Sequence, residues 1–243
     1  TAMKQAYNFA KERMQFSRSI KEFAMIKNKF AKMIVKIWES DGICYATTGS
    51  IDESISKLDK KDPNYYAKMQ KSIEDHGIEA SICKIVGSET LAYCVDESVQ
   101  IFGGAGFIEE YPAAEAYRDE RINRIFEGTN EINRLLISGL MLKKAILEEL
   151  PIRDQIFLRE AKWNPEISFD ESHEFIKEIK LIELSRSVVL NILHQLILEY
   201  GQDLKNEQWA LEPLADIITY LSIMQTGFTR YNQLENSKHK SLS

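Results

Sequence analysis

Residues 124–133 read Arg-Ile-Phe-Glu-Gly-Thr-Asn-Glu-Ile-Asn, and they place one carboxylate, Glu127, between an apolar pair and a glycine. Thr129 stands directly before a run with apolar residues at helical spacing. These residues are Ile132, Leu135, Leu136, Leu140 and Leu142. The hydroxyl of Thr129 can accept a hydrogen bond from an unpaired backbone N–H of a first helical turn, so the pattern predicts a helix that begins at Thr129 and continues to about Leu150. Glu127 then lies just outside a helix start.

The expected surroundings of Glu127 favour two opposite charge states. The positive end of the following helix dipole favours the ionised carboxylate, whereas the apolar Ile125 and Phe126 favour the neutral acid. Opposing influences of this kind adjust a glutamate toward the pH range in which a general base works best. Two hypotheses therefore stand for Glu127. It is either a catalytic base or an acid at a helix start without a chemical role, and base rates favour the second.

The composition is that of an ordinary globular protein. Of the 243 residues, 44% are hydrophobic and 28% are charged, which suffices for a sizeable core in one large domain or two small ones. The net charge of -6, without a basic stripe, argues against nucleic-acid binding. No apolar run approaches about 18 residues, so neither a membrane span nor a signal peptide is predicted. Cys44, Cys83 and Cys94 lack paired spacing, which favours reduced, buried thiols over disulfides or a metal site.

The apolar periodicity predicts an all-α fold. The predicted helices cover residues 2–16, 22–58 and 63–100, a short segment that begins at Tyr111, and the segment from Thr129 to about Leu150. Glycines within residues 103–106 interrupt the pattern, either as a plain interhelical turn or where the backbone approaches a ligand closely. Long antiparallel helices with short links predict an up-and-down four-helix bundle over residues 1–150.

A second helical region is predicted after Pro151, which marks the expected domain boundary. Asp170 can cap a helix that runs through Tyr200, and one further helix follows. The predicted organisation is therefore a bundle over residues 1–150 and a helical C-terminal extension over residues 151–243.

Three segments, in this order and spacing, resemble the acyl-CoA dehydrogenase family. They are Tyr-Asn-Phe-Ala-Lys-Glu-Arg-Met-Gln-Phe at residues 7–16, Gln-Ile-Phe-Gly-Gly-Ala-Gly-Phe at residues 100–107 with Tyr-Arg-Asp at residues 117–119, and Arg-Ile-Phe-Glu-Gly-Thr-Asn-Glu-Ile at residues 124–132. Together these matches are highly specific. The tail resembles, with weaker motif support, the helical extension of the very-long-chain members. The resemblance implies that the chain is the C-terminal part of a longer enzyme.

The implied activity is the FAD-dependent dehydrogenation of fatty acyl-CoA thioesters in fatty acid β-oxidation. The resemblance implies that Glu127 is the catalytic base, which removes the α-proton while the β-hydride goes to flavin N5 and a trans-2-enoyl-CoA forms. The backbone N–H of Glu127 and a flavin ribityl hydroxyl would hold the developing enolate. Phe126 and Gly128 are the implied substrate-binding residues. The fragment alone is expected to bind FAD weakly and to be inactive, because much of the flavin site lies elsewhere.

The resemblance also assigns residues to the FAD site. Arg13 is the implied partner of the pyrophosphate, which suits the planar fork of a guanidinium, and Phe16 is an implied packing surface. Ser17 stands where the family usually has glycine, a departure that concerns the local turn. A solvated basic loop is the alternative for residues 13–21. The full set of implied FAD contacts is Arg13, Gln15, Phe16, Gln100, Ile101, Phe102, Gly103, Gly104, Thr129, Asn130 and Glu131.

The resemblance implies an electron-transfer flavoprotein as electron acceptor. It implies a homodimer or homotetramer, because the matched FAD contacts are shared between subunits. Neither nucleic acid nor a metal ion is expected, and contact of the tail with a membrane surface stays open. The expected location is the cytoplasm of a bacterium or the mitochondrial matrix of a eukaryote. Two other functions stay open: a non-catalytic helical module for dimerisation or docking, and an acyl-CoA oxidase-like enzyme that passes electrons to oxygen.

Overall fold

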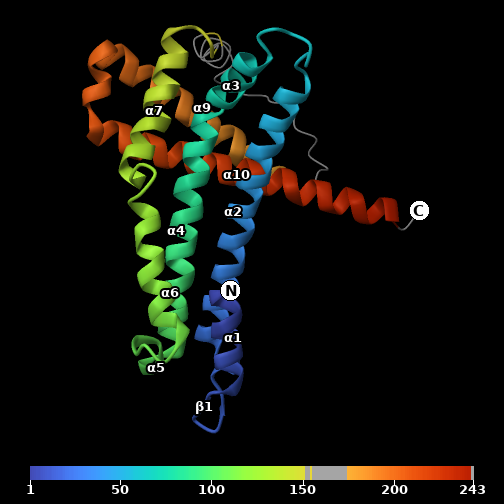
Figure 1. Cartoon of the computed structure of the whole chain (residues 1–243), viewed down its shortest axis with the longest axis vertical. Helices are drawn as coiled ribbons and strands as arrows, with labels where there is room; N and C mark the ends of the chain where they lie inside the picture. Colours follow the sequence, from blue (N-terminus) through green and yellow to red (C-terminus); the bar gives the residue numbers. More distant parts are fainter. Residues whose placement is uncertain (151–153, 155–173, 242–243) are drawn as a thin grey trace. The chain divides into compact units, whose positions relative to one another are not determined.

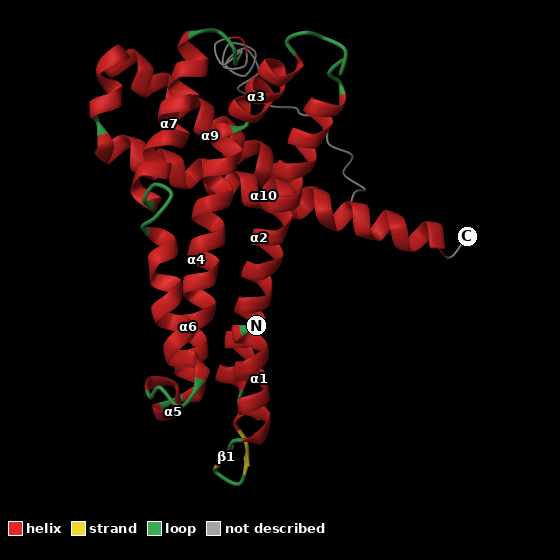
Figure 2. Cartoon of the chain, in the orientation of Figure 1, coloured by secondary structure: helices red, strands yellow, loops and turns green. Residues whose placement is uncertain are grey.

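The computed structural model describes residues 1–150, 154 and 174–241, and over these ranges the chain is almost entirely helical (Figure 1; Figure 2). The predicted all-α fold class is confirmed. The helices are α1 (Ala2–Glu12), η1 (Ile20–Glu22), α2 (Ala24–Ser56), α3 (Tyr65–Asp75), α4 (Gly77–Phe102), α5 (Gly104–Phe107), α6 (Pro112–Glu120), η2 (Arg121–Arg124), α7 (Asn130–Ile146), α9 (Ile176–Tyr200), η3 (Gly201–Asn206) and α10 (Gln208–Ser241). Within the described ranges, the strands are β1 (Met14–Gln15) and β2 (Arg18–Ser19), which pair antiparallel.

Contacts within the chain group its residues into two compact units. Unit 1 holds residues 1–45 and 83–130, and unit 2 holds residues 46–82 and 131–243. The long helices α2 and α4 each contribute residues to both units. Every residue of the predicted active site except Glu131 belongs to unit 1.

The core of unit 1 includes residues from α1, α2 and the end of α4. Ala6 and Ala10 are fully buried on α1, and such small side chains let neighbouring helices pack closely. Met33, from the apolar stripe predicted for α2, is also fully buried. The ring of Phe9 stacks on that of Phe102, with the ring centroids 4.3 Å apart. This packing fixes the end of α4 against α1.

Helix α1 ends four residues before its predicted end, because the chain turns into a short hairpin. Arg13 is extended, with φ -72° and ψ 116°, and β1 and β2 follow. Phe16 and Ser17 have positive φ values of 49° and 65°, the backbone geometry of a tight two-residue hairpin turn. The hydroxyl of Ser19 donates to the carbonyl oxygen of Ala10 at 2.7 Å and ties the hairpin to α1. The positive φ of Ser17 explains why glycine, the usual family residue, suits this position.

The single helix predicted over residues 63–100 is two helices, α3 and α4, which meet at His76 (φ -96°, ψ 20°). The imidazole Nε2 of His76 lies 3.0 Å from the hydroxyl oxygen of Ser50 on α2. Asp62 lies in the turn before α3, where its carboxylate accepts a hydrogen bond from the backbone N–H of Asn64 at 2.8 Å. The prediction was wrong at His76 because a break of one residue leaves the apolar periodicity intact.

Unit 2 is built around α9, η3 and α10, and α7 packs on this group. Its buried apolar residues include Leu142, Val189, Leu193, Leu204, Leu211, Leu214 and Ala215. The fully buried hydroxyl of Ser138 donates to the carbonyl oxygen of Leu211 at 2.7 Å. The guanidinium Nε of Arg134 lies 2.7 Å from a carboxylate oxygen of Asp216. These contacts join α7 to α10.

Helix α9 is long and apolar enough to cross a membrane by length and composition alone. This differs from the expectation of no membrane span. That expectation required an uninterrupted apolar run, and Glu183 and Arg186 interrupt the apolar run in α9. Part of α9 lies in the core of unit 2, where Val189 and Leu193 are buried, whereas Leu198 is exposed. The core helix of a soluble protein passes the same test.

The predicted domain boundary at Pro151 and the predicted helix cap at Asp170 lie outside the described residues. The division into a bundle over residues 1–150 and an extension over residues 151–243 therefore stays a prediction. The structure does show that α7 ends at Ile146, a few residues before its predicted end.

The three cysteines differ in burial. Cys94 is buried in the core of unit 1, Cys83 is partly buried and Cys44 is exposed on α2. The expectation of buried thiols is therefore wrong for Cys44. Burial raises the pKa of the Cys94 thiol, so less of the reactive thiolate forms at neutral pH.

Candidate active site

The loop of residues 125–129 joins η2 to α7 and carries Glu127. Glu127 and Gly128 follow one another with positive φ values of 56° and 79°. Glycine adopts this left-handed region freely, whereas a residue with a Cβ atom loses about 1–2 kcal/mol there. A glutamate in such a conformation persists only where the surrounding structure holds it, and residues of this kind cluster at functional sites.

The side chains of this loop are presented outward. Glu127 is exposed, and Ile125 and Phe126 are each 47% exposed. The sequence led us to expect an apolar environment for the carboxylate from these two neighbours, and in this chain by itself they do not enclose it. An exposed carboxylate beside half-exposed apolar side chains is suited to a ligand that has both a polar and an apolar part.

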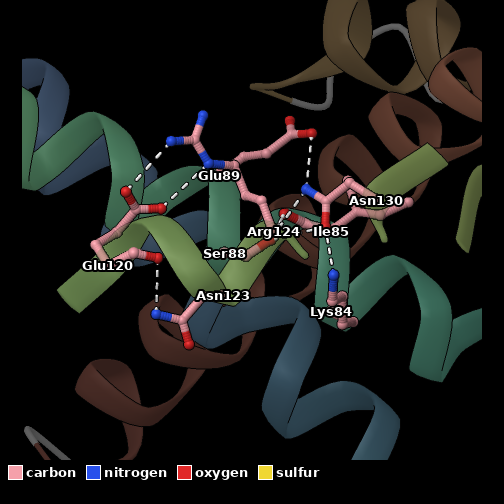
Figure 3. Close-up of polar contacts among 8 residues, drawn as sticks. All are labelled: Lys84, Ile85, Ser88, Glu89, Glu120, Asn123, Arg124 and Asn130. Atoms are coloured by element: carbon pink, nitrogen blue, oxygen red, sulfur yellow. Dashed lines mark hydrogen bonds and ion pairs between the residues drawn. The ribbon is translucent and has the colours of Figure 1, made fainter. Parts of the chain in front are cut away.

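The loop begins at a buried ion pair. Glu120, at the end of α6, has a side chain only 1% exposed, and its Oε1 lies 3.2 Å from Nε of Arg124 (Figure 3). The Arg124 Nη2 also donates to Oε2 of Glu120 at 3.3 Å, and Asn123 donates through its amide to the Glu120 carbonyl oxygen at 3.0 Å. A buried carboxylate is costly unless a cation and hydrogen bonds accompany it. The pair therefore fixes Arg124, directly before the loop.

The loop ends at a polar cluster, formed by the buried Asn130 and three residues of α4, of which Ser88 is buried, Lys84 partly buried and Glu89 exposed (Figure 3). Asn130 is 3% exposed, and its Oδ1 accepts a hydrogen bond from Lys84 Nζ at 2.6 Å. Its Nδ2 donates to Ser88 Oγ at 3.0 Å and to Glu89 Oε1 at 3.2 Å. The first residue of α7 is thus bonded to side chains of α4.

Sequence reasoning missed the three α4 residues and Glu120. Lys84 and Ser88 stand four residues apart and so share a face of α4, which is the one signal that the sequence offers. Their partner Asn130 is 46 residues from Lys84, and local pattern does not reveal it. The prediction that Asn130 lies next to FAD stays a prediction, and the structure adds that its side chain is bonded within the chain.

The hairpin presents the predicted residues Arg13, Gln15 and Phe16 at the surface, with Phe16 88% exposed at the tip. Nearby, the guanidinium of Arg18 lies over the ring of Phe23, 4.1 Å from its centroid. Two arginines are therefore displayed on one short hairpin, an arrangement suited to a phosphate group.

The predicted cofactor segment at the end of α4 is partly exposed and partly core. Gln100, Gly103 and Gly104 are exposed, whereas Ile101 and Phe102 are buried in the core of unit 1. Their side chains pack in the core, so a ligand could contact only the backbone atoms of these two residues. Gly103 has φ 61°, and a Cβ atom built on it or on Gly104 would meet nothing within 4 Å. The backbone here is open to close approach.

Within unit 1, the predicted site residues form two separate groups. The hairpin and the glycine turn at α5 lie at one end, whereas the loop that follows η2 lies at the other end of α6 (Figure 1). The nine residues of α6 alone span about 13 Å at 1.5 Å per residue. One chain therefore does not bring Arg13, Gly103 and Gly104 together with Glu127. Over the described residues, no cluster of three His, Cys, Asp or Glu side chains could hold a metal ion.

Comparison with known proteins agrees with the resemblance drawn from the three motifs. The family model of the acyl-CoA dehydrogenase C-terminal domain matches residues 1–142. A Bacillus subtilis (strain 168) protein named "Probable acyl-CoA dehydrogenase" is 34% identical over 223 residues, which are 91% of this chain and 38% of that protein. The mitochondrial very long-chain specific acyl-CoA dehydrogenase of Bos taurus is 28% identical over 257 residues, covering 96% of this chain and 36% of its own length.

A solved structure extends the agreement to the fold. The crystal structure of an acyl-CoA dehydrogenase complexed with FAD from Bacillus anthracis superposes with a TM-score of 0.89 at 35% identity, over 96% of this chain and 40% of that chain. The chain belongs to the acyl-CoA dehydrogenase family. It spans well under half the length of these relatives.

Proposed function

We propose that the complete protein containing this chain is an FAD-dependent dehydrogenase of fatty acyl-CoA thioesters, with Glu127 as its catalytic base. Family membership supports the reaction class, and the geometry of one residue carries the assignment. Glu127 is an exposed carboxylate in a strained conformation, on a loop whose two ends are anchored by the buried side chains of Glu120 and Asn130. The proposal applies to the complete protein, because the chain spans 38% of the Bacillus subtilis relative.

The residues present fit the FAD that the family implies. Arg13 is an exposed cation on the hairpin, and Gly103 and Gly104 leave open backbone on the same end of unit 1. We propose that these residues, with Gln15 and Phe16, hold the phosphate-bearing part of the cofactor. The guanidinium is a good partner for phosphate, whereas the Gly103 N–H already donates to the Val99 carbonyl oxygen at 3.0 Å, so the glycines contribute room for close approach.

The chain contributes the proton-transfer half of the proposed reaction. The carboxylate of Glu127 takes the proton from the α-carbon of the thioester, and its own backbone N–H donates to the thioester oxygen as negative charge develops there. Gly128 has no side chain to obstruct the thioester, and the half-exposed ring of Phe126 can cover it and exclude water. Bound FAD supplies the acceptor for the hydride from the β-carbon. An electron-transfer flavoprotein is the electron acceptor that the family resemblance supports.

The separation of the two groups of site residues supports a homo-oligomer. The hairpin and the glycine turn at α5 lie at one end of unit 1, and the loop of residues 125–129 follows η2 beyond the other end of α6 (Figure 1). We propose that one flavin site takes the hairpin and glycine turn from one copy and the loop of Glu127 from another. A C2 dimer allows this arrangement. Its two-fold symmetry makes every contact between the copies occur twice, so two equivalent flavin sites form.

The test of the catalytic role is Glu127→Gln in the complete protein, which keeps the size of the side chain and removes the base. We expect the rate at which acyl-CoA bleaches the bound flavin under anaerobic conditions to fall roughly 100- to 10,000-fold, because that is the contribution of a positioned general base. Stopped-flow absorbance of the flavin measures this rate. The matched control is Glu110→Gln, an exposed glutamate in the turn before α6, which should leave the rate unchanged. A Glu127→Gln enzyme with near-normal bleaching would rule out the assignment.

A further inference from the structure

The polar cluster of Lys84, Ser88, Glu89 and Asn130, in which Ser88 and Asn130 are buried, joins α4 to the first residue of α7 (Figure 3). We infer that Asn130 is a positioning residue, which holds the loop of residues 125–129 in the conformation that presents Glu127. The inference rests on the proposed function, because it concerns the same reaction.

The partners of Asn130 dictate which way its amide points. The oxygen faces the ammonium of Lys84 at 2.6 Å, and the amide nitrogen faces the carboxylate of Glu89 at 3.2 Å. Rotating the amide by half a turn would place two donors together at Lys84 and two acceptors together at Glu89. Ser88 Oγ lies 3.0 Å from Nδ2, and it can also donate, to Oδ1 at 3.2 Å. One orientation alone satisfies all three partners, so the start of α7 has a defined position on α4.

The loop needs such an anchor because its backbone is strained. Glu127 and Gly128 are consecutive residues with positive φ, and the side chains of Ile125 and Phe126 are half exposed, so their packing within this chain contributes little to holding the loop. The ion pair of Glu120 with Arg124 fixes the residue before the loop, and Asn130 fixes the residue after it. With both ends fixed, the five residues between them have few alternative conformations. Loss of the anchor at Asn130 would remove one of the contacts that hold the strained conformation at Glu127.

A misplaced base has a specific kinetic consequence. Proton abstraction depends on the distance and alignment of the carboxylate, and a displacement of about 1 Å can cost on the order of 100-fold in rate. Binding of the flavin and of the CoA portion of the substrate depends much less on that alignment. Loosening the anchor should therefore lower kcat more than it raises KM. A purely structural role would instead lower the yield of folded protein and leave the rate per bound flavin unchanged.

Two serines of α4 provide a matched pair of variants. Ser88 and Ser98 are both buried, and each hydroxyl donates to a backbone carbonyl of α4, of Ile85 at 3.1 Å and of Cys94 at 2.7 Å. Ser88 also contacts Asn130, and no such contact is recorded for Ser98 among the described residues. We expect Ser88→Ala to slow flavin reduction per bound flavin about tenfold, and Ser98→Ala to leave it unchanged.

Asn130 itself allows a test by rescue. Asn130→Asp keeps an acceptor for Lys84 but places a second carboxylate against Glu89, so we expect the rate per bound flavin to fall roughly 10- to 100-fold. Adding Glu89→Gln restores a donor opposite an acceptor, because the new amide can donate to the new carboxylate. The double variant should recover most of the lost rate. Hydrogen exchange in the protein without ligand gives an independent readout: the amides of residues 127–130 should exchange faster in Asn130→Asp and return toward wild-type rates in the double variant.

The outcomes separate this inference from the proposed function. If the wild-type protein does not reduce flavin with any acyl-CoA, the proposed function fails, and the exchange rates still decide whether Asn130 orders the loop. If the wild type reduces flavin but Ser88→Ala and Asn130→Asp keep its rate per bound flavin, the positioning role is wrong. Slow flavin reduction in Asn130→Asp without recovery on adding Glu89→Gln would also overturn it.

Discussion

Gly128 matters both for the backbone conformation of the loop and for the proposed reaction. Its φ of 79° follows the strained Glu127, and in the proposed reaction the thioester passes beside this residue because it has no side chain. Gly128→Ala should lower the free energy of unfolding by about 1–2 kcal/mol, because a Cβ atom is disfavoured in the left-handed region. The same change should slow flavin reduction, since the loop can shift to relieve the strain. Chemical denaturation and stopped-flow absorbance measure the two effects.

Gly49→Ala is the control for that substitution. Gly49 lies inside α2, its φ is not positive, and a Cβ atom there would meet nothing within 4 Å. Alanine favours a helix interior over glycine by about 1 kcal/mol, so this variant should be more stable and fully active. A Gly128→Ala protein that gained stability as Gly49→Ala does would contradict the role given to its positive φ.

The residues that carry the proposed chemistry could be predicted from the sequence to different extents. Glu127 could be singled out because a carboxylate, a glycine and a helix start lie within a few residues, but the local pattern leaves its role open, and the catalytic role stays a prediction that rests on the family resemblance. The contact of Lys84 with Asn130 was not predictable, because the two residues are 46 positions apart and many polar residues on α4 share a face. The core positions of Ile101 and Phe102 were also missed, since their neighbours along the chain include glycines that suggest exposure. Burial depends on what packs against a residue, which the sequence does not state locally.

At the scale of elements, apolar periodicity predicted α2 close to its observed bounds and the end of α9 at Tyr200, and it predicted one further helix, which is α10. It failed where the structure changes within two or three residues. The strands β1 and β2 are two residues each, too short to show an alternating pattern, so the hairpin was included in a helix or loop. The break at His76 removes no apolar position from the periodic pattern of residues 63–100, so the sequence pattern did not reveal it. Turn residues would have been the remaining signal, and Phe16 and Ser17 are not typical ones.

Helix α7 gives a prediction at this scale, because it is tied to α10 by buried polar contacts. The hydroxyl of Ser138 is fully buried and donates to the Leu211 carbonyl oxygen at 2.7 Å. Ser138→Ala should lower the free energy of unfolding by about 1–3 kcal/mol, because the change leaves a buried acceptor without this donor. Ser222→Ala is the control, since its recorded hydrogen bond goes to the Ile218 carbonyl oxygen within α10. Equal destabilisation by both variants would show that the contact between helices adds nothing to stability.

At the scale of the whole molecule, the separation of the two groups of site residues predicts complementation between inactive copies. One group contains Arg13 and the glycine turn, and the other contains Glu127 (Figure 1). Arg13→Glu and Glu127→Gln should each give a nearly inactive protein. In a C2 dimer that contains one copy of each, both lesions fall in one flavin site and the other site is intact. The purified mixed dimer should therefore show roughly half of the wild-type activity per total protein.

The control for complementation uses two lesions in the same group. Thr129 belongs with Glu127, so a dimer of one Thr129→Val copy and one Glu127→Gln copy has a lesion in each site. Co-expression of those two variants should restore nothing beyond the sum of the separate activities. The measurement is flavin reduction by acyl-CoA per total protein, after co-expression with two different affinity tags and purification of the mixed oligomer. If Arg13→Glu and Glu127→Gln also fail to complement, although the mixed oligomer forms, then the hairpin does not serve the flavin site of another copy. If activity recovers with Arg13→Glu and Glu127→Gln but not with the control pair, then one chain supplies the phosphate-binding residues of each site and the other chain supplies its base.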